Sequence, residues 1–112
     1  MEEILRKLMR IEQIVNEYLN EYLVYLAPGY TNPWKAMILW PQGEIRMPYP
    51  QNEVELWIFF HEIGHQISHE RGWKGSFNDR IGQRYANRWA DKQMKKHYLP
   101  IPTATLKPFL ER

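Results

Sequence analysis

Residues 54–67 read VELWIFFHEIGHQI, and this stretch decides the fold. Apolar residues recur along it at the three- and four-residue spacing of a helix, and the pair Asn52-Glu53 offers a cap at its start. The predicted helix runs from this cap to about Glu70. Because the segment is rich in Trp, Ile and Phe, we expect this helix to be the most buried element of the chain.

The same helix carries His61-Glu62-Ile63-Gly64-His65, which is an HExxH motif. Residues four apart share one helical face, so both imidazoles can reach one zinc ion at ~2.0–2.1 Å while the intervening Glu can take a proton from water. Chance would place the motif in roughly one chain in a hundred of this composition. The motif therefore predicts a zinc site with His61 and His65 as ligands and Glu62 as general base.

A zinc hydrolase normally has a third protein ligand, and the sequence leaves several candidates open. His69 continues the face of the two motif histidines, but three turns of a straight helix spread over ~12 Å, too far to surround one ion. The other candidates lie on the last long predicted helix, four residues apart along one polar stripe: Asp79, Gln83, Asn87 and Asp91.

Length and composition indicate a single domain. A chain of 112 residues, 44% hydrophobic and 25% charged, is typical of one small globular core spanning residues 1–112. With no cysteine, disulfides and thiol catalysis are excluded. Apolar runs such as Leu56 to Phe60 are far shorter than the roughly 20 residues of a membrane-spanning helix, and residues 1–10 lack a secretory signal. We therefore expect a cytoplasmic protein without membrane contact.

The basic residues concentrate in one part of the chain. Residues 66–99 carry a net charge of +5, whereas residues 1–65 carry −4. The cations of this basic stretch could contact nucleic acid or an acidic protein, although their density is more typical of solvated helix faces. They are Arg71, Lys74, Arg80, Arg84, Arg88, Lys92, Lys95 and Lys96.

The residues before the motif predict a helix followed by a hairpin. An amphipathic pattern runs over Glu2 to Leu26 and ends at Ala27-Pro28-Gly29. Two short β-compatible runs, Trp34 to Trp40 and Glu44 to Met47, flank Pro41-Gln42-Gly43. A small sheet should therefore precede the motif helix.

The residues after the motif predict a loop, a second long helix and a tail. The loop covers Gly72 to Ser76, and the helix runs from about Asn78 to His97. The prolines in Ile101 to Arg112 favour an extended strap. Together these elements give an α+β fold.

The order of these elements resembles the ImmA/IrrE-type metallopeptidases. The motif helix, followed by Ala86-Asn87-Arg88-Trp89-Ala90 on the next helix, is similar to that family's HExGH, short loop and E-x-x-A-N-x-F-A signature, over about residues 34–95. The resemblance implies a minimal zincin-like domain whose third ligand comes three residues before Ala86. That position is Gln83. Because an amide oxygen is a weaker zinc ligand than a carboxylate, either Gln83 holds the metal loosely or Asp91, or else Asp79, replaces it.

Two functions follow as hypotheses. The first is a Zn²⁺-dependent peptidase acting on a protein or peptide; the resemblance implies a regulatory substrate such as a helix-turn-helix transcriptional repressor. In zincins of this layout an exposed strand edge can hold an extended peptide, and strand 44–47 is the candidate. The alternative, motivated by Gln83, is a catalytically inactive binding or regulatory protein of the same fold. Direct binding of nucleic acid is a further, less favoured hypothesis.

Overall fold

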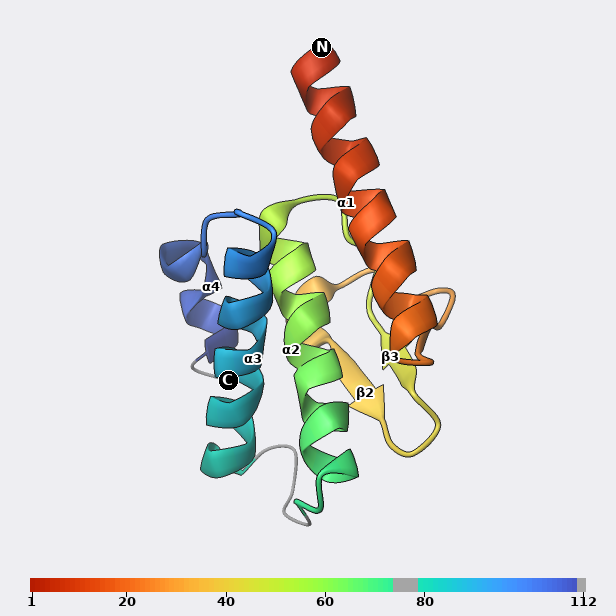
Figure 1. Cartoon of the computed structure of the whole chain (residues 1–112), viewed down its shortest axis with the longest axis vertical. Helices are drawn as coiled ribbons and strands as arrows, with labels where there is room; N and C mark the ends of the chain where they lie inside the picture. The colour runs from red at the N-terminus through yellow and green to blue at the C-terminus, as the bar shows by residue number, and fades with distance from the viewer. Residues whose placement is uncertain (74–78, 111–112) are drawn as a thin grey trace.

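A computed structural model describes residues 1–73 and 79–110 and confirms the α+β class. Helices α2 and α3 lie antiparallel, with α1 and the sheet to one side and α4 to the other (Figure 1). None of the helices in these two ranges has the length and apolar composition needed to cross a membrane. The elements are α1 (Glu2–Glu21), β1 (Tyr25–Leu26), a 3₁₀ turn (Pro33–Lys35), β2 (Met37–Leu39), β3 (Glu44–Arg46), α2 (Glu53–Glu70), α3 (Arg80–Lys96) and α4 (Thr103–Leu110).

Helix α2 is the buried centre of the molecule, as its composition predicts. Every residue from Leu56 to Ser68 is buried. The Asn52 side chain accepts a hydrogen bond from the Glu55 backbone N–H at 2.9 Å, which satisfies one of the free donors at the helix start. The predicted cap and helix are both confirmed.

The predicted hairpin is confirmed, but the sheet has a third strand. Strand β2 pairs antiparallel with β3, and Ile38 lies opposite Ile45; both side chains are buried. Strand β1 pairs with β3 in parallel, so β3 is the central strand of the order β1-β3-β2. The prediction that strand 44–47 offers an open edge is therefore wrong, because both of its edges are paired. Strands β1 and β2 form the edges.

Helix α1 ends earlier than its amphipathic pattern predicts. Leu23 adopts the left-handed backbone conformation, with φ of 54°, which stops the helix two residues after Glu21. The following backbone turns into the sheet, where the Tyr25 N–H donates to the Gly43 carbonyl at 2.9 Å. The predicted end at Leu26 is wrong because pairing with β3 takes precedence over the apolar period.

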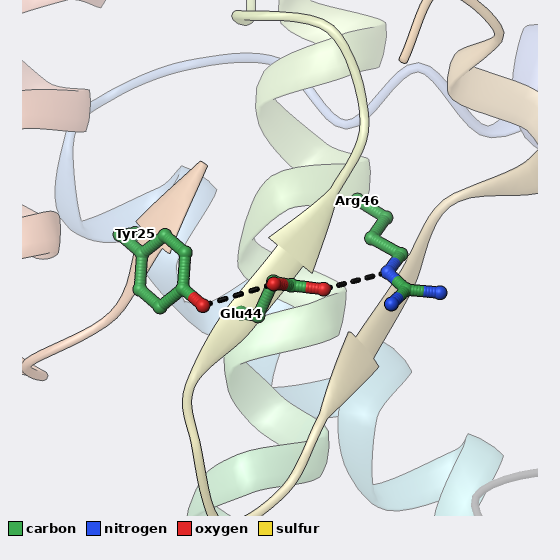
Figure 2. Close-up of polar contacts among 3 residues, drawn as sticks. All are labelled: Tyr25, Glu44 and Arg46. Carbon is green, nitrogen blue, oxygen red and sulfur yellow. Dashed lines mark hydrogen bonds and ion pairs between the residues drawn. The ribbon is translucent and has the colours of Figure 1, made fainter. Parts of the chain in front are cut away.

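A polar cluster ties β1 to β3 on the sheet face opposite α2 (Figure 2). The Glu44 carboxylate accepts a hydrogen bond from the Tyr25 hydroxyl at 2.9 Å and from Arg46 Nε at 2.6 Å. These two bonds hold the pKa of Glu44 below its ordinary value, with the bond from Arg46 contributing most. Because residues alternate across a strand, Ile45 between them points to the core.

The second long helix is confirmed, and the tail differs from its prediction. Asp79 caps α3 by accepting from the Ile81 N–H at 2.8 Å. Most of the predicted loop 72–76, and Asn78, lie outside the described residues. The strap predicted for residues 101–112 is wrong over Thr103–Leu110, which form α4. Burial of Leu106 and Phe109, one helical turn apart, stabilises this helix despite its internal Pro108.

Candidate metal centre

The two motif histidines meet on one face of α2. Their rings are nearly perpendicular, at 89°, with centroids 4.6 Å apart. His61 Nε2 and His65 Nε2 lie 3.0 Å from each other. The i, i+4 geometry of the helix thus brings two nitrogen donors to one point, as the spacing predicts.

The Glu62 carboxylate completes the cluster. Its Oε2 lies 4.0 Å from His61 Nε2. One ligand atom from each of His61, Glu62 and His65 lies within 4.8 Å of the others, and all three residues are buried, with 1–2% of their surface exposed. We refer to these three residues as the HEH cluster. It is the only group of at least three His, Asp or Glu with this proximity in residues 1–73 and 79–110.

The donors of the HEH cluster fit zinc. Imidazole nitrogens and carboxylate oxygens are preferred zinc ligands, and the site offers no softer donor because the chain lacks cysteine. Two nitrogens bound to one tetrahedral ion stand roughly 3.3 Å apart, given bonds of about 2.0–2.1 Å. The observed 3.0 Å between the two Nε2 atoms is close to that separation.

Two aromatic rings enclose His61. Trp57, one turn earlier on α2, stacks on its imidazole at 5.3 Å between centroids and an interplanar angle of 25°. Phe109 of α4 stands edge-on against the same imidazole at 5.0 Å. Sequence reasoning missed both residues. Trp57 could have been found from its i−4 position relative to His61, whereas no local pattern connects Phe109 to the motif.

Asp91, a candidate third ligand, contacts the wall of the site. Its Oδ1 accepts a hydrogen bond from Trp57 Nε1 at 2.8 Å, so it holds the indole that stacks on His61. Asp91 is not a member of the HEH cluster. Its role as a metal ligand stays a prediction.

Helix α3 packs closely against α2 at Gly64, within the HExxH motif. A Cβ placed on Gly64 would lie only 3.0 Å from Ala86 Cα. Gln83, half-buried, lies one turn before Ala86 on the same helix. The structure thus brings the α3 segment that carries Gln83 against the motif helix, and Gln83 as third ligand stays a prediction.

Asp79, His69 and the cations of the basic stretch are not part of the HEH cluster. Asp79 is exposed and caps α3. The His69 ring lies 5.3 Å from the ring of Trp40, at the end of β2, one turn beyond the HEH cluster. The cations of the basic stretch lie outside the cluster: those from Arg80 to Lys96 are exposed along α3, Arg71 is exposed after α2, and Lys74 is not among the described residues.

Comparisons of the chain with models of known protein families, with curated proteins and with solved structures found no match. The case for a metal centre therefore rests on the chemistry and geometry of this chain's own residues.

Proposed function

We propose that this chain is a zinc-dependent peptidase of zincin-like fold, which holds Zn²⁺ on His61 and His65 and uses Glu62 as general base. The observation that carries the proposal is the meeting of the two Nε2 atoms at 3.0 Å beside a buried carboxylate. A cation bound between these donors would offset part of the free-energy cost of burying them away from water.

The chain's residues divide the work of peptide hydrolysis. When bound, zinc polarises the substrate carbonyl and lowers the pKa of a water molecule toward ~7. Glu62 accepts the proton that the attacking water loses and delivers it to the leaving amine nitrogen. Edge strand β2, which packs beside α2, is the proposed site where an extended substrate adds main-chain hydrogen bonds. We propose a regulatory protein such as a helix-turn-helix repressor as the substrate.

Zinc analysis of purified variants tests the metal site. We expect one zinc per wild-type chain and none in His61→Ala or His65→Ala, because each variant loses a strong donor. His69→Ala is the matched control: it removes a histidine from the next turn of the same helix and should keep its zinc. Full zinc occupancy in both ligand variants would refute the site.

Cleavage assays with a fluorogenic peptide library and a purified repressor test the activity. General acid-base groups contribute roughly 10² to 10⁴-fold in rate, so Glu62→Gln should lose cleavage by that factor. It should retain the fold and most of the zinc, since Glu62 acts on the water. Loss of zinc from Glu62→Gln together with activity would make Glu62 a ligand instead of a base.

One observation favours a second candidate, a binding protein without turnover. The position that the resemblance assigns to the third ligand is Gln83, a neutral amide. A wild-type protein that is folded, loaded with zinc and bound to its partner, yet leaves the partner uncut over long incubation, would establish this alternative.

A further inference from the structure

Helix α4 closes one side of the HEH cluster through the ring of Phe109. This ring stands edge-on to His61 at 5.0 Å and edge-on to Trp57 at 5.9 Å. Phe109 is 3% exposed, and Leu106, one turn earlier, is 1% exposed. Phe109, one of the two aromatic residues that enclose His61, therefore comes from the far end of the sequence.

Helix α4 is attached by few side chains. Its other six residues are exposed, so Leu106 and Phe109 form its entire buried face. An eight-residue helix is too short to be stable by itself, and Pro108 removes one of its backbone donors. Elements with few buried contacts open locally at the lowest free energy. Helix α4 is such an element, whereas α2 is buried along most of its length.

The closed arrangement conflicts with turnover of a large substrate. A scissile peptide bond must come within hydrogen-bonding reach of Glu62, but the three cluster residues expose only 1–2% of their surface. Of the described elements in ring contact with His61, α2 itself holds the motif and cannot withdraw. Helix α4 is the other described element in this ring contact, and its withdrawal removes only two of its own side chains, Leu106 and Phe109, from the core.

We propose that α4 is a detachable cover of the HEH cluster, and that Phe109 occupies the place that a large apolar side chain of the substrate takes when α4 withdraws. This inference rests on the proposed function. It also predicts specificity: the vacated position is walled by the Trp57 indole and the His61 imidazole, so it favours an aromatic or large aliphatic side chain.

Carbethoxylation of histidines by diethyl pyrocarbonate, followed by mass spectrometry, tests the cover in the metal-free full chain. In Phe109→Ala the modification of His61 and His65 should accelerate at least about fivefold, because local opening exposes their nitrogens. His69 and His97 serve as internal references, since global unfolding would accelerate all four histidines. Leu110→Ala, which alters an exposed residue of the same helix, should match wild type. Leu106→Ala keeps Phe109 but loosens α4, and should also accelerate His61 and His65.

A rescue experiment tests the apolar position. N-acetyl-phenylalaninamide should slow the modification of His61 in Phe109→Ala by refilling the vacated space, whereas N-acetyl-alaninamide should not. Equal modification rates in wild type, Phe109→Ala and Leu106→Ala would overturn the cover. Acceleration without rescue by the phenylalanine amide would overturn the substrate position.

The outcome for the cover is separable from the outcome for the peptidase. The modification assay needs neither zinc nor cleavage. Selective acceleration of His61 and His65 in a chain that binds no zinc would support the cover and refute the proposed function. A zinc-loaded, active chain whose histidines are modified at unchanged rates in the variants would support the proposed function and refute the cover.

Discussion

Gly64 lies between the two motif histidines at a point where α2 and α3 nearly touch. A Cβ at this position would lie 3.0 Å from Ala86 Cα and 3.2 Å from Trp89 Cβ. The nearest neighbour is backbone, which cannot rotate away as a flexible side chain can. The glycine therefore sets the distance between the motif helix and α3, the helix that carries the predicted third ligand.

Gly64→Ala provides a test in which two effects have opposite signs. Helix propensity alone predicts a gain of about 1 kcal/mol in the free energy of unfolding. The steric contact predicts a loss of about 1–3 kcal/mol, because α2 and α3 must separate. We expect the loss, measured by urea unfolding at constant m-value. A variant more stable than wild type would show that the two helices can separate easily.

The predicted ligand positions can be distinguished by charge. We expect Gln83→Glu to bind zinc at least about tenfold more tightly. Mutation of residues that only hydrogen-bond to metal ligands already changes metal affinity roughly 10–100-fold, and a new carboxylate ligand should do at least as much. Asp91→Asn removes a charge but still lets the amide oxygen accept the Trp57 hydrogen bond, so it should keep the metal. Competition with a chromophoric chelator measures both affinities. If Gln83→Glu changes nothing while Asp91→Asn releases zinc, Asp91 is the ligand.

At the scale of elements, α1 is joined to α3 by a buried polar network. The Tyr18 hydroxyl donates to Gln93 Oε1 at 2.6 Å and lies 2.9 Å from His97 Nε2. Its one proton is used by Gln93, so neutral His97 donates to the hydroxyl oxygen. Burial raises the pKa of Tyr18, and this keeps the hydroxyl protonated. Of the two neutral tautomers of His97, the network thus selects the one that carries its proton on Nε2.

The surroundings of His97 predict a pH dependence of stability. Burial lowers the pKa of His97, and the cations Lys96 and Arg10 lower it further, while Glu17 opposes them. Because the folded pKa lies below the unfolded value of about 6.5, the unfolded chain binds more protons as pH falls below that value. The free energy of unfolding should therefore decrease from pH 7 toward the folded pKa. His97→Gln should weaken this dependence of the free energy of unfolding on pH. Urea unfolding at pH 7 and at a pH below the unfolded value of about 6.5 measures it. An equal pH slope in the two proteins would contradict the assignment.

At the scale of the whole molecule, burial is distributed unevenly. The structure measures 45 × 28 × 27 Å along its principal axes, and the first half of α1 projects beyond the other elements (Figure 1). Every residue from 1 to 10 is exposed, and the Lys7 side chain stays more than half exposed, at 55%, in its salt bridge to Glu53 at 2.8 Å. The centre of the molecule is instead α2 with the rings packed around it.

This distribution predicts a hierarchy of amide hydrogen exchange. Amides of α2 from Leu56 to Ser68 should exchange only through global unfolding, with free energies equal to that from urea unfolding. Amides of residues 2–10 should exchange far faster, through local fraying. Mass spectrometry of proteolytic fragments would resolve the two segments. Comparable protection in both would mean that the projecting part of α1 is covered in solution.

The amino-acid sequence alone determined the features that depend on neighbours a few residues apart. The Asn52 cap, the course of α2 and the hairpin of β2 with β3 follow from local hydrogen bonding and apolar periodicity. The proximity of His61 and His65 follows from the same helical geometry. These features need no contact with distant parts of the chain.

Only the tertiary structure decided the features that join distant segments. Tyr25 and Leu26 continue an apolar helical pattern, yet they form a strand because β3 offers them parallel hydrogen bonds. Residues 103–110 contain a proline that disfavours a helix, yet they are helical because Leu106 and Phe109 are buried against the body. The contact of Phe109 with His61 spans nearly half the sequence. Local propensities do not encode such contacts, because their free energy exists only once the whole chain has packed.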